Sequence, residues 1–343
     1  MAHSVYPAVT HTDPSGQTKK DFASDVDPRW CPGCGDYSIL AQVQKVLPGL
    51  GIPKENYVFV SGIGCSSRFP YYMDTYGIHS IHGRGPAFAT GIKSQRPDLS
   101  VWLITGDGDG LSIGGNHFIH LMRRNVDVNV LLFNNRIYGL TKGQYSPTSQ
   151  LGTKAKSTPM GSIDYPLDPI HVALGAGATF VARTLDTHLK HLPEILKRGA
   201  EHKGTSFIEI YQNCPIFNDG EFVQLTDKTR REDTTLELEH GKPMRFGKQR
   251  EKGIVLDGSL NPQVVDVAEV GEDRLMVFDE TNEMCSLVVS RLTGPDVPTP
   301  IGVMRAVERP TYEHLLNEQL TTAGHAAGKG VQDLLNQGKW VVT

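Results

Sequence analysis

The chain has 343 residues, of which 38% are hydrophobic and 21% are charged, with a formal net charge of −4 and a pI near 6.3. This length suits one large or two modest domains, and the acidic balance argues against nucleic acid as a partner. No apolar run approaches the ~20 residues that cross a bilayer, so we expect no membrane association. The N-terminal sequence lacks the pattern of a secretory leader, which favours a cytoplasmic protein.

Strand-like and helical patterns alternate along the first two thirds of the chain. Apolar runs typical of buried strands lie at 57–61, 100–105, 128–133, 178–182 and 206–211. Helical patterns accompany them at about 36–46, 84–95, 114–125 and 187–202. This alternation predicts an α/β fold, with a doubly wound, mainly parallel sheet and helices on both faces.

Composition divides the chain into three parts. Residues 1–25 are polar and predict an extended arm, whereas residues 26–225 hold the alternating elements. Residues 226–343 are more charged and less periodic, so we expect a small C-terminal extension in which Glu237–Lys252 is a solvated excursion. The segment Tyr145–Pro169 carries four prolines and predicts a long loop, which in a compact domain is usually functional.

A run rich in glycine and aspartate follows the strand predicted at 100–105. It reads Gly-Asp-Gly-Asp-Gly at 106–110, and Asn134-Asn135 ends the next predicted strand. Neighbouring parallel strands end at one edge of the sheet, so these polar side chains should meet there. Carboxylate, amide and main-chain oxygens suit Mg²⁺, and glycines allow the backbone to approach a diphosphate. Gly-Asp-Gly alone is also an ordinary turn, which is the competing interpretation.

The spacing of these residues resembles the thiamine-diphosphate motif, a Gly-Asp-Gly followed downstream by Asn or Asn-Asn. This resemblance implies that Asp107, Asn135 and the peptide oxygen of Ile137 bind Mg²⁺. The second carboxylate, Asp109, either lines the site or caps the turn. The sequence therefore predicts thiamine diphosphate as cofactor.

Five cysteines form a second set of candidate ligands. Cys31 and Cys34 share a Cys-Pro-Gly-Cys turn, and Cys65 and Cys214 each follow a predicted strand. A thiol redox pair, structural zinc and an iron–sulfur centre are all compatible with thiol ligands, and one close pair plus two distant cysteines favours the iron–sulfur centre. An odd count and the missing leader argue against a disulfide framework. Cys285 lies in an apolar stretch and is expected to pack as a small apolar residue.

The motifs together resemble one family, the beta subunits of 2-oxoacid:ferredoxin oxidoreductases. The resemblance covers about residues 25–225 and rests on five segments in order: Trp30–Gly35, Gly62–Ser66, His82–Arg84, Gly106–Asp109 and Asn134–Pro147. It implies a [4Fe–4S] cluster with four ligands: Cys31, Cys34, Cys65 and Cys214. From about Lys228 onward the chain is most similar to the 2-oxoglutarate branch.

The resemblance also implies which residues meet cofactor and substrate. Lys142 would meet the substrate carboxylate, or alternatively a phosphate of coenzyme A. Leu140 would wedge the bent cofactor, and His82 would contact its diphosphate side, with Arg84 adding charge. The expected cofactor-binding residues are Ile63, Gly64, Cys65, Ser66, His82, Gly83, Gly106, Asp107, Gly108, Asp109, Asn135, Ile137, Gly139 and Leu140.

The chain shows no counterpart for the pyrimidine-binding half of a thiamine site, where a Glu is needed. A second polypeptide is therefore expected, and the resemblance implies an alpha subunit, sometimes fused to a gamma domain. The implied reaction converts a 2-oxoacid and coenzyme A to acyl-CoA and CO₂, with ferredoxin as electron acceptor. Pyruvate or a broad set of 2-oxoacids is the alternative to 2-oxoglutarate as substrate, and a non-enzymatic zinc protein is the alternative of a different class.

Overall fold

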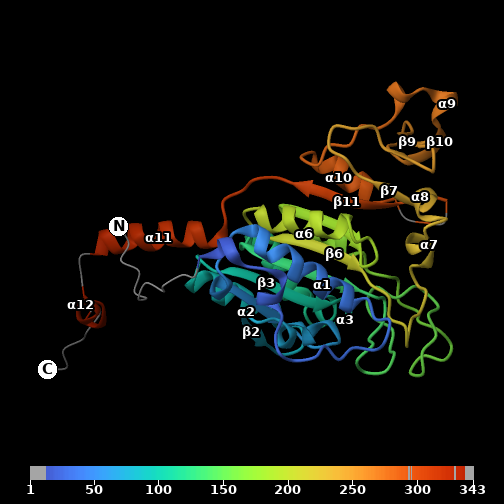
Figure 1. Ribbon diagram of the computed structural model, residues 1–343. Coiled ribbons are helices and arrows are strands. Elements are labelled where there is room, and N and C mark those ends of the chain that lie inside the picture. The colour runs from blue at the N-terminus through green and yellow to red at the C-terminus, as the bar shows by residue number, and fades with distance from the viewer. Residues whose placement is uncertain (1–12, 293, 295, 328–329, 337–343) are drawn as a thin grey trace.

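The computed structural model describes residues 13–292, 294, 296–327 and 330–336 (Figure 1). Its main feature is an eight-stranded sheet in the order β2-β1-β3-β4-β6-β5-β11-β7. In that order the strands are Tyr76–His79, Tyr57–Ser61, Ser100–Gly106, Val128–Asn134, Ser206–Tyr211, Phe180–Leu185, Thr299–Ala306 and Thr235–Glu237.

Neighbouring strands from β2 to β5 all run parallel. β11 joins β5 in the antiparallel sense, and β7 pairs with β11 in parallel. The register of β3 and β4 runs from Val101 opposite Val128 to Gly106 opposite Phe133, so the polar segments that follow both strands begin side by side. The predicted mainly parallel α/β sheet is confirmed.

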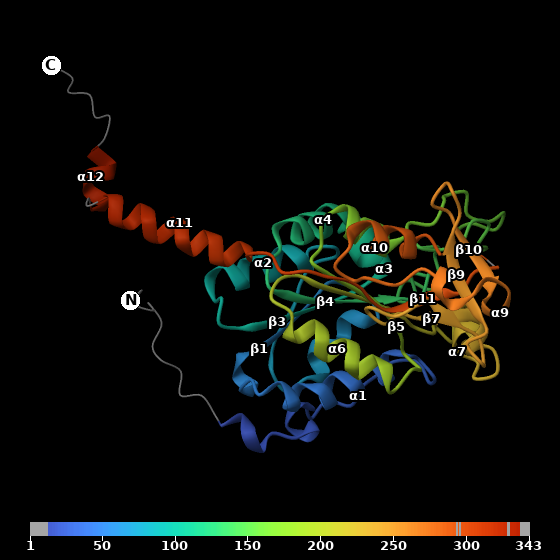
Figure 2. The same cartoon turned by 90° about the horizontal axis from the view of Figure 1, so that it is seen from above.

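Helices cover both faces of this sheet (Figure 2). Alternate residues of a strand point to opposite faces, so Val101 and Leu103 of β3 enter one hydrophobic core while Trp102 and Ile104 enter the other. The second core is covered by α1 (Asp36–Val46) and α6 (His191–Glu201). The first core is covered by α2 (Gly85–Gln95), α4 (Gly115–Arg124), α5 (Pro169–Gly175) and α10 (Glu283–Ser290).

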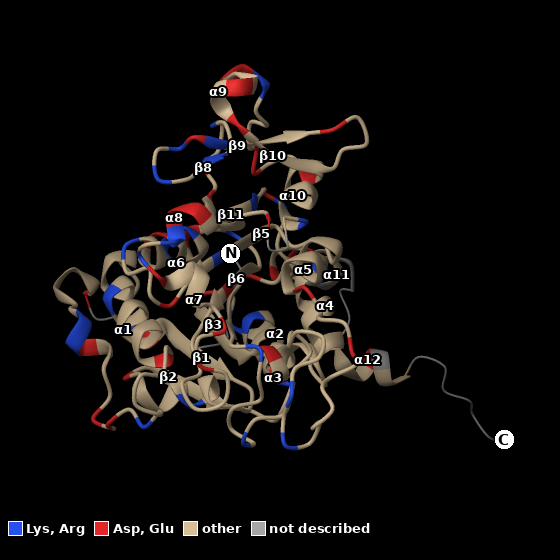
Figure 3. Ribbon diagram, turned by 90° about the vertical axis from the view of Figure 1, so that its right-hand side faces the viewer, with Lys and Arg blue, Asp and Glu red and all other residues tan. Residues whose placement is uncertain are grey.

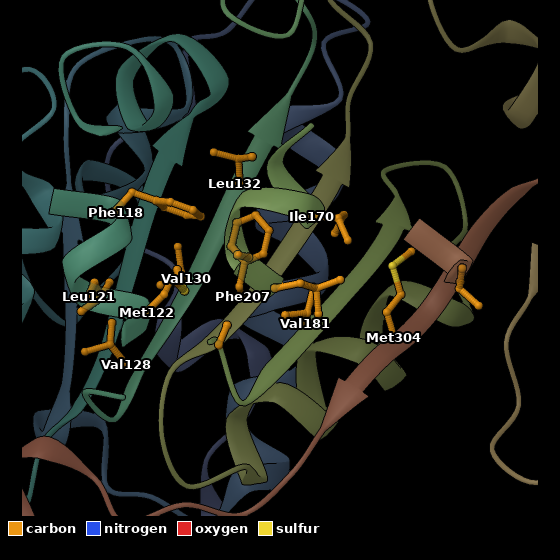
Figure 4. Packing of buried hydrophobic residues seen from close by; sticks show 14 of the residues in the cluster. Phe118, Leu121, Met122, Val128, Val130, Leu132, Ile170, Val181, Phe207 and Met304 are labelled. Carbon is orange, nitrogen blue, oxygen red and sulfur yellow. The ribbon is translucent and has the colours of Figure 1, made fainter. Parts of the chain in front are cut away.

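The packing of α4 shows how the sequence pattern becomes structure (Figure 4). Phe118, Leu121 and Met122 form one apolar face of the helix and are all buried. The ring of Phe118 lies 5.1 Å from that of Phe207 on β6, in an edge-to-face contact. Burial of each such side chain stabilises the fold by about 1.5–3 kcal/mol. Asn125 ends the helix in the left-handed conformation, with φ 54°.

Most elements of the main domain begin and end close to the predicted positions. The largest shift concerns α6, which begins at His191 rather than at 187, because a turn precedes it in which the N–H of His188 donates to the oxygen of Leu185. The segment Tyr145–Pro169 is a loop as expected, and Pro169 begins α5. The pattern did not indicate β2, which is a short, largely exposed edge strand, and it did not indicate β11 or β7.

The N-terminal segment differs from the extended arm that its composition predicted. Residues 1–12 lie outside the described residues, but Pro14–Gly16 and Lys19–Phe22 form 3₁₀ turns. Phe22 is fully buried, with its ring 5.6 Å from that of Tyr57. The N–H of Asp74 also donates to the oxygen of Phe22 at 3.0 Å, and the N–H of Ser24 donates to the oxygen of Tyr72 at 3.3 Å. One buried side chain and these backbone bonds therefore hold the segment on the main domain.

The C-terminal part contributes to two sheets. β7 and β11 extend the main sheet across the boundary expected at residue 225. Met244 and Phe246 are buried, so Glu237–Lys252 is not the wholly solvated excursion that was predicted. The remaining strands form a separate antiparallel sheet: β8 (Arg245–Phe246), β9 (Lys252–Leu256) and β10 (Pro262–Asp266).

The remaining helices lie at the periphery. α11 (Tyr312–Ala327) projects from the main body and leads to α12 (Val331–Asn336), as Figures 1 and 2 both show. Three short helices belong to the C-terminal part or the chain leading to it: α7 (Val223–Thr226), α8 (Arg231–Thr234) and α9 (Val267–Val270). Among the described residues, no helix combines the length and apolarity needed to cross a bilayer.

Candidate active site

A cavity of about 410 Å³ lies where β1, β3 and β4 end. Figure 3 looks onto this edge of the sheet, and α3 (Asp107–Leu111) lies there. The Gly-Asp-Gly-Asp-Gly run was expected to be a turn, but from Asp107 it forms this short helix. The cavity is lined by Asp36, Ile63, Gly64, Cys65, Ser66, His82, Gly106, Asp107, Gly108, Asp109, Phe133, Asn135, Ile137, Tyr138, Gly139, Leu140, Thr141 and Gln144.

Asp109 ties three segments together beneath this cavity. Its Oδ1 accepts hydrogen bonds from the backbone N–H groups of Ile63, at 2.9 Å, and Gly83, at 2.7 Å. The same oxygen lies 2.8 Å from Nδ1 of His82, while Oδ2 accepts from the hydroxyl of Thr105 at 2.6 Å. Asp109 is 3% exposed, so this carboxylate serves mainly to join the loops after β1 and β2 to the end of β3. His82 lines the cavity, and Nε2 is the ring nitrogen that this bond leaves for a ligand.

Asp107 is held from the opposite side by the long loop. Its Oδ2 accepts hydrogen bonds from the hydroxyls of Ser146, at 2.5 Å, and Thr148, at 2.7 Å, so neither hydroxyl occupies Oδ1. Burial raises the pKa of Asp107 to about 6, although both hydroxyls act to lower it. A carboxylate that is costly to ionise in the fold gains most from a nearby cation, so its setting fits a metal ligand.

The segment after β4 presents the side-chain amide of Asn135 to the same cavity. The amide nitrogen of Asn135 donates to Oε1 of Gln212 at 2.8 Å, and its Oδ1 accepts from the N–H of Ile137 at 3.2 Å. Asn134 faces away from the cavity and donates to the buried Glu209 at 2.7 Å. Arg136 adopts φ 57°, and this left-handed residue bends the chain so that both of its neighbours reach the cavity.

The chain then folds back over the cavity as a small hairpin. Tyr138 donates its hydroxyl to the oxygen of Gly108 at 2.9 Å, and its ring occupies the space that a Cβ at Gly108 would need. The N–H of Gly143 returns to the oxygen of Tyr138 at 2.9 Å. Leu140 lines the cavity, whereas Lys142 is exposed, does not line it and adopts φ 77°. The predicted contact of Lys142 with a substrate carboxylate therefore stays a prediction.

The four cysteines of the expected cluster lie beside the same cavity. Cys34 donates its N–H to the oxygen of Cys31 at 3.0 Å, in a turn that places Gly33 at φ 81°. A Cβ built on Gly139 would lie 3.5 Å from the sulfurs of both Cys65 and Cys214. The hairpin over the cavity therefore packs directly against two of the four sulfurs.

The environment of these thiols is apolar and negatively charged. Burial raises the pKa of Cys34 and Cys214, and it raises that of Cys65 to about 12. The negative charge of Asp36 raises the pKa of all three thiols further. Burial, and then the charge of Asp186, raise the pKa of Asp36 itself to about 7. The Oδ2 atom of Asp36 is buried without a hydrogen bond. Such thiols bind a cationic centre with release of protons.

The described residues contain no group of three His, Cys, Asp or Glu side chains close enough to hold a single metal ion. Cys285 lies apart from the four cysteines in the C-terminal part, buried in the first hydrophobic core, and its sulfur accepts from the N–H of Asp279 at 3.4 Å.

The cavity gathers the expected cofactor-binding residues with one exception. The exception is Gly83, which does not line the cavity but donates its backbone N–H to the lining residue Asp109. Sequence reasoning missed several lining residues, of which Tyr138, Thr141 and Gln144 lie within the Asn134–Pro147 motif and were therefore within reach. It also missed two further lining residues, Asp36 and Phe133. Three residues that support the site without lining the cavity were missed as well: Ser146, Thr148 and Gln212. For Asp36 and Gln212, the only sequence feature that pointed to the site was their position near the cysteines.

The chain is similar to known proteins along almost its whole length. Residues 62–210 match the family described as thiamine pyrophosphate enzyme, C-terminal TPP binding domain. The 2-oxoglutarate oxidoreductase subunit KorB of Mycobacterium tuberculosis is 51% identical over 333 residues, covering 95% of this chain and 89% of that protein. The beta subunit of 2-oxoacid:ferredoxin oxidoreductase 1 of Aeropyrum pernix is 50% identical over 198 residues, covering 58% of this chain and 62% of that protein.

A solved structure extends the likeness to the fold. The 2-oxoglutarate:ferredoxin oxidoreductase from Magnetococcus marinus, with 2-oxoglutarate, coenzyme A and succinyl-CoA bound, has a chain that superposes with a TM-score of 0.77 at 32% identity. The match covers 95% of this chain and 97% of that one. The cavity at the strand ends, the matched thiamine-binding domain and the full-length relative agree, and the chain belongs to the beta subunits of the 2-oxoacid:ferredoxin oxidoreductases, with its greatest likeness in the 2-oxoglutarate branch.

Proposed function

We propose that this chain is the beta subunit of a 2-oxoglutarate:ferredoxin oxidoreductase and supplies the diphosphate side of a thiamine-diphosphate site together with a [4Fe–4S] cluster. The reaction converts 2-oxoglutarate and coenzyme A to succinyl-CoA and CO₂, and oxidised ferredoxin takes up the released electrons. One observation carries the proposal. A single cavity brings together Asp107, Asn135 and Ile137, and the hairpin that covers it packs on Cys65 and Cys214.

The oxygen donors fit a Mg²⁺ ion that anchors a diphosphate. Asp107 supplies the negative charge, with its orientation fixed by Ser146 and Thr148 through Oδ2. Asn135 and the peptide oxygen of Ile137 supply neutral oxygens, which together leave positions for phosphate and water. When bound, thiamine diphosphate supplies a carbon nucleophile that attacks the ketone of the substrate. The residues of this chain hold its diphosphate and cover its ring with Gly139 and Leu140.

The sulfur donors fit an iron–sulfur cluster. Cys31, Cys34, Cys65 and Cys214 come from three loops. The raised pKa values of Cys34, Cys65 and Cys214 reflect a buried setting that a cationic centre relieves. A cluster, when bound, accepts electrons one at a time and passes them to ferredoxin. A zinc site would need all four sulfurs around one ion, and the described residues show no such gathering of ligands.

The substrate assignment rests on the relatives. The M. tuberculosis relative is named for 2-oxoglutarate, and the M. marinus structure holds 2-oxoglutarate, coenzyme A and succinyl-CoA. Lys142, at the rim, is the residue of this chain that we assign to the substrate carboxylate, with a coenzyme A phosphate as the alternative. A pyruvate enzyme would need a small closed pocket in place of a cation for the distal carboxylate.

An alpha-type subunit is needed to complete the site. The loop Tyr145–Pro169 buries Ser146 and Thr148 against Asp107, yet its outer part exposes three large side chains, Met160, Ile163 and Tyr165, by 84–93%. Large apolar side chains exposed in one loop are typical of a protein interface. We assign this loop to the contact with the alpha subunit, in a cytoplasmic complex.

Coexpression with an alpha-type subunit under anaerobic conditions tests the proposal. The purified complex should contain iron and acid-labile sulfide and should reduce ferredoxin only when 2-oxoglutarate and coenzyme A are both present. The isolated chain should be nearly inactive. A colourless complex with one zinc would contradict the cluster, high activity of the isolated chain would contradict the shared site, and a higher kcat/KM for pyruvate would contradict the substrate.

A further inference from the structure

Gln212 lies between the two halves of the site. It follows β6 directly and is 1% exposed. Its Oε1 accepts a hydrogen bond from the amide nitrogen of Asn135 at 2.8 Å, and its Nε2 donates to the sulfur of Cys34 at 3.1 Å. One side chain therefore touches an expected Mg²⁺ ligand and an expected cluster ligand.

The orientation of this amide is fixed by its partners. The second hydrogen of Nε2 goes to the peptide oxygen of Asn213 at 2.6 Å, so both N–H bonds are used. A reversed amide would set a nitrogen against the amide nitrogen of Asn135 and an oxygen against the carbonyl of Asn213. The backbone N–H of Gln212 also donates to the oxygen of Asn134 at 3.0 Å, which ties the residue to the end of β4.

The close approach of Gln212 to the cysteine loop depends on a glycine. Gly35 is buried at the start of α1, and its N–H donates to the oxygen of Asn213 at 3.3 Å. A Cβ at this position would lie 2.8 Å from Cγ of Gln212 and would also clash with the carboxylate of Asp186. Only a residue without a side chain allows the amide to reach Cys34.

We propose that Gln212 is a positioning residue that couples the two half-sites: its oxygen orients Asn135 for Mg²⁺, and its nitrogen stabilises negative charge on the sulfur of Cys34. The inference rests on the proposed function, because it assumes that Asn135 and Cys34 ligate their respective centres. A hydrogen bond to a ligating sulfur favours the reduced cluster, so Gln212 raises its midpoint potential. The same bond network keeps the amide oxygen of Asn135 toward the metal.

Two variants of the reconstituted complex separate these roles. Gln212→Leu removes both bonds, so the midpoint potential of the cluster should become more negative and Mg²⁺-dependent cofactor binding should weaken about tenfold. Gln212→Glu keeps an oxygen for Asn135 but loses the nitrogen donor, so it should shift the potential while Mg²⁺ affinity stays near that of the wild type. Electron paramagnetic resonance during a redox titration measures the first quantity, and calorimetry of thiamine diphosphate binding measures the second.

A matched control is Gln44→Leu, which alters another buried glutamine, 6% exposed, whose Nε2 donates to the oxygen of Tyr72 at 3.1 Å. It should change neither quantity. If the Gln212 variants carry the cluster at the wild-type potential, the inference is overturned. If the Leu variant does not fold, a wild-type potential in Gln212→Glu is sufficient to overturn it. A wild-type complex without iron would instead overturn the proposed function and this inference with it.

Discussion

The oxygen half-site and the sulfur half-site are prepared by the fold in different ways. In the first, hydroxyl, imidazole and backbone groups already hold the two carboxylates, Asp107 and Asp109. In the second, the sulfurs lie on loops, and burial raises the pKa of three of the thiols, those of Cys34, Cys65 and Cys214. The carboxylates of the oxygen site are therefore oriented by the fold itself, whereas the buried thiols of the proposed sulfur site would ionise only when a metal centre binds.

Removing a cluster ligand should have the largest effect. Serine at Cys31, Cys34, Cys65 or Cys214 should in each case lose or destabilise the cluster, because a hydroxyl is a poor substitute for a thiolate on iron. Iron content and the electron paramagnetic resonance signal after reduction measure this. The matched control is Cys285→Ser, which should keep the full cluster; a complete cluster in any of the four variants would show that the ligand set is wrong.

Substitutions of the two aspartates of α3 should have different effects, one on cofactor binding and the other on stability. Asp107→Asn should abolish Mg²⁺-dependent cofactor binding, because it removes the anionic ligand, while the folded chain remains. Asp109→Asn should affect Mg²⁺ less but should lower the free energy of unfolding by about 3 kcal/mol, since an amide nitrogen would face buried donors. Calorimetric titration and thermal unfolding separate the outcomes, and equal Mg²⁺ loss in both variants would refute this division of roles.

The pH dependence of Mg²⁺ binding should report on Asp107. Burial raises the pKa of this carboxyl to about 6, so the proton competes with the metal below that pH and not above it. Apparent Mg²⁺ affinity should be constant near neutral pH and should fall by about tenfold per pH unit well below pH 6. A fall that begins only near pH 4 would show that Asp107 does not bind the metal in its buried setting.

The smallest effect is expected at the rim. Lys142→Gly removes the charge but suits the left-handed φ of 77°, so the fold should be unharmed while KM for 2-oxoglutarate rises about tenfold. Lys203→Ala, at an exposed position on the opposite edge of the sheet, is the control and should change nothing. A rise in KM for coenzyme A alone would reassign Lys142 to a phosphate of that substrate.

The differences between prediction and structure follow from the range of the interactions. The parallel strands β1, β3, β4, β6 and β5 have a continuous apolar pattern, so their positions were predictable from local sequence, whereas the antiparallel β11 was missed. The edge strand β2 and the terminal strand β7 are short and gain their stability from neighbours, so no local signal marked them. Phe22 likewise stands alone in a polar segment, and its position depends on contacts with residues distant in sequence: the ring of Tyr57 and the backbone N–H of Asp74.

The sequence by itself determined which residues are candidate ligands, because metal ligands need particular atoms and glycine-rich turns must follow strands. Asp107, Asn135 and the four cysteines were predicted as ligands in this way, and the sheet brings all three motifs to one edge. Only the tertiary structure decided how these groups are held. Asp109 became a clamp, Ser146 and Thr148 reached Asp107 from a distant loop, and Gln212 joined the two half-sites. Such partners are far apart in sequence and leave no local pattern, because their positions depend on the packing of the whole sheet.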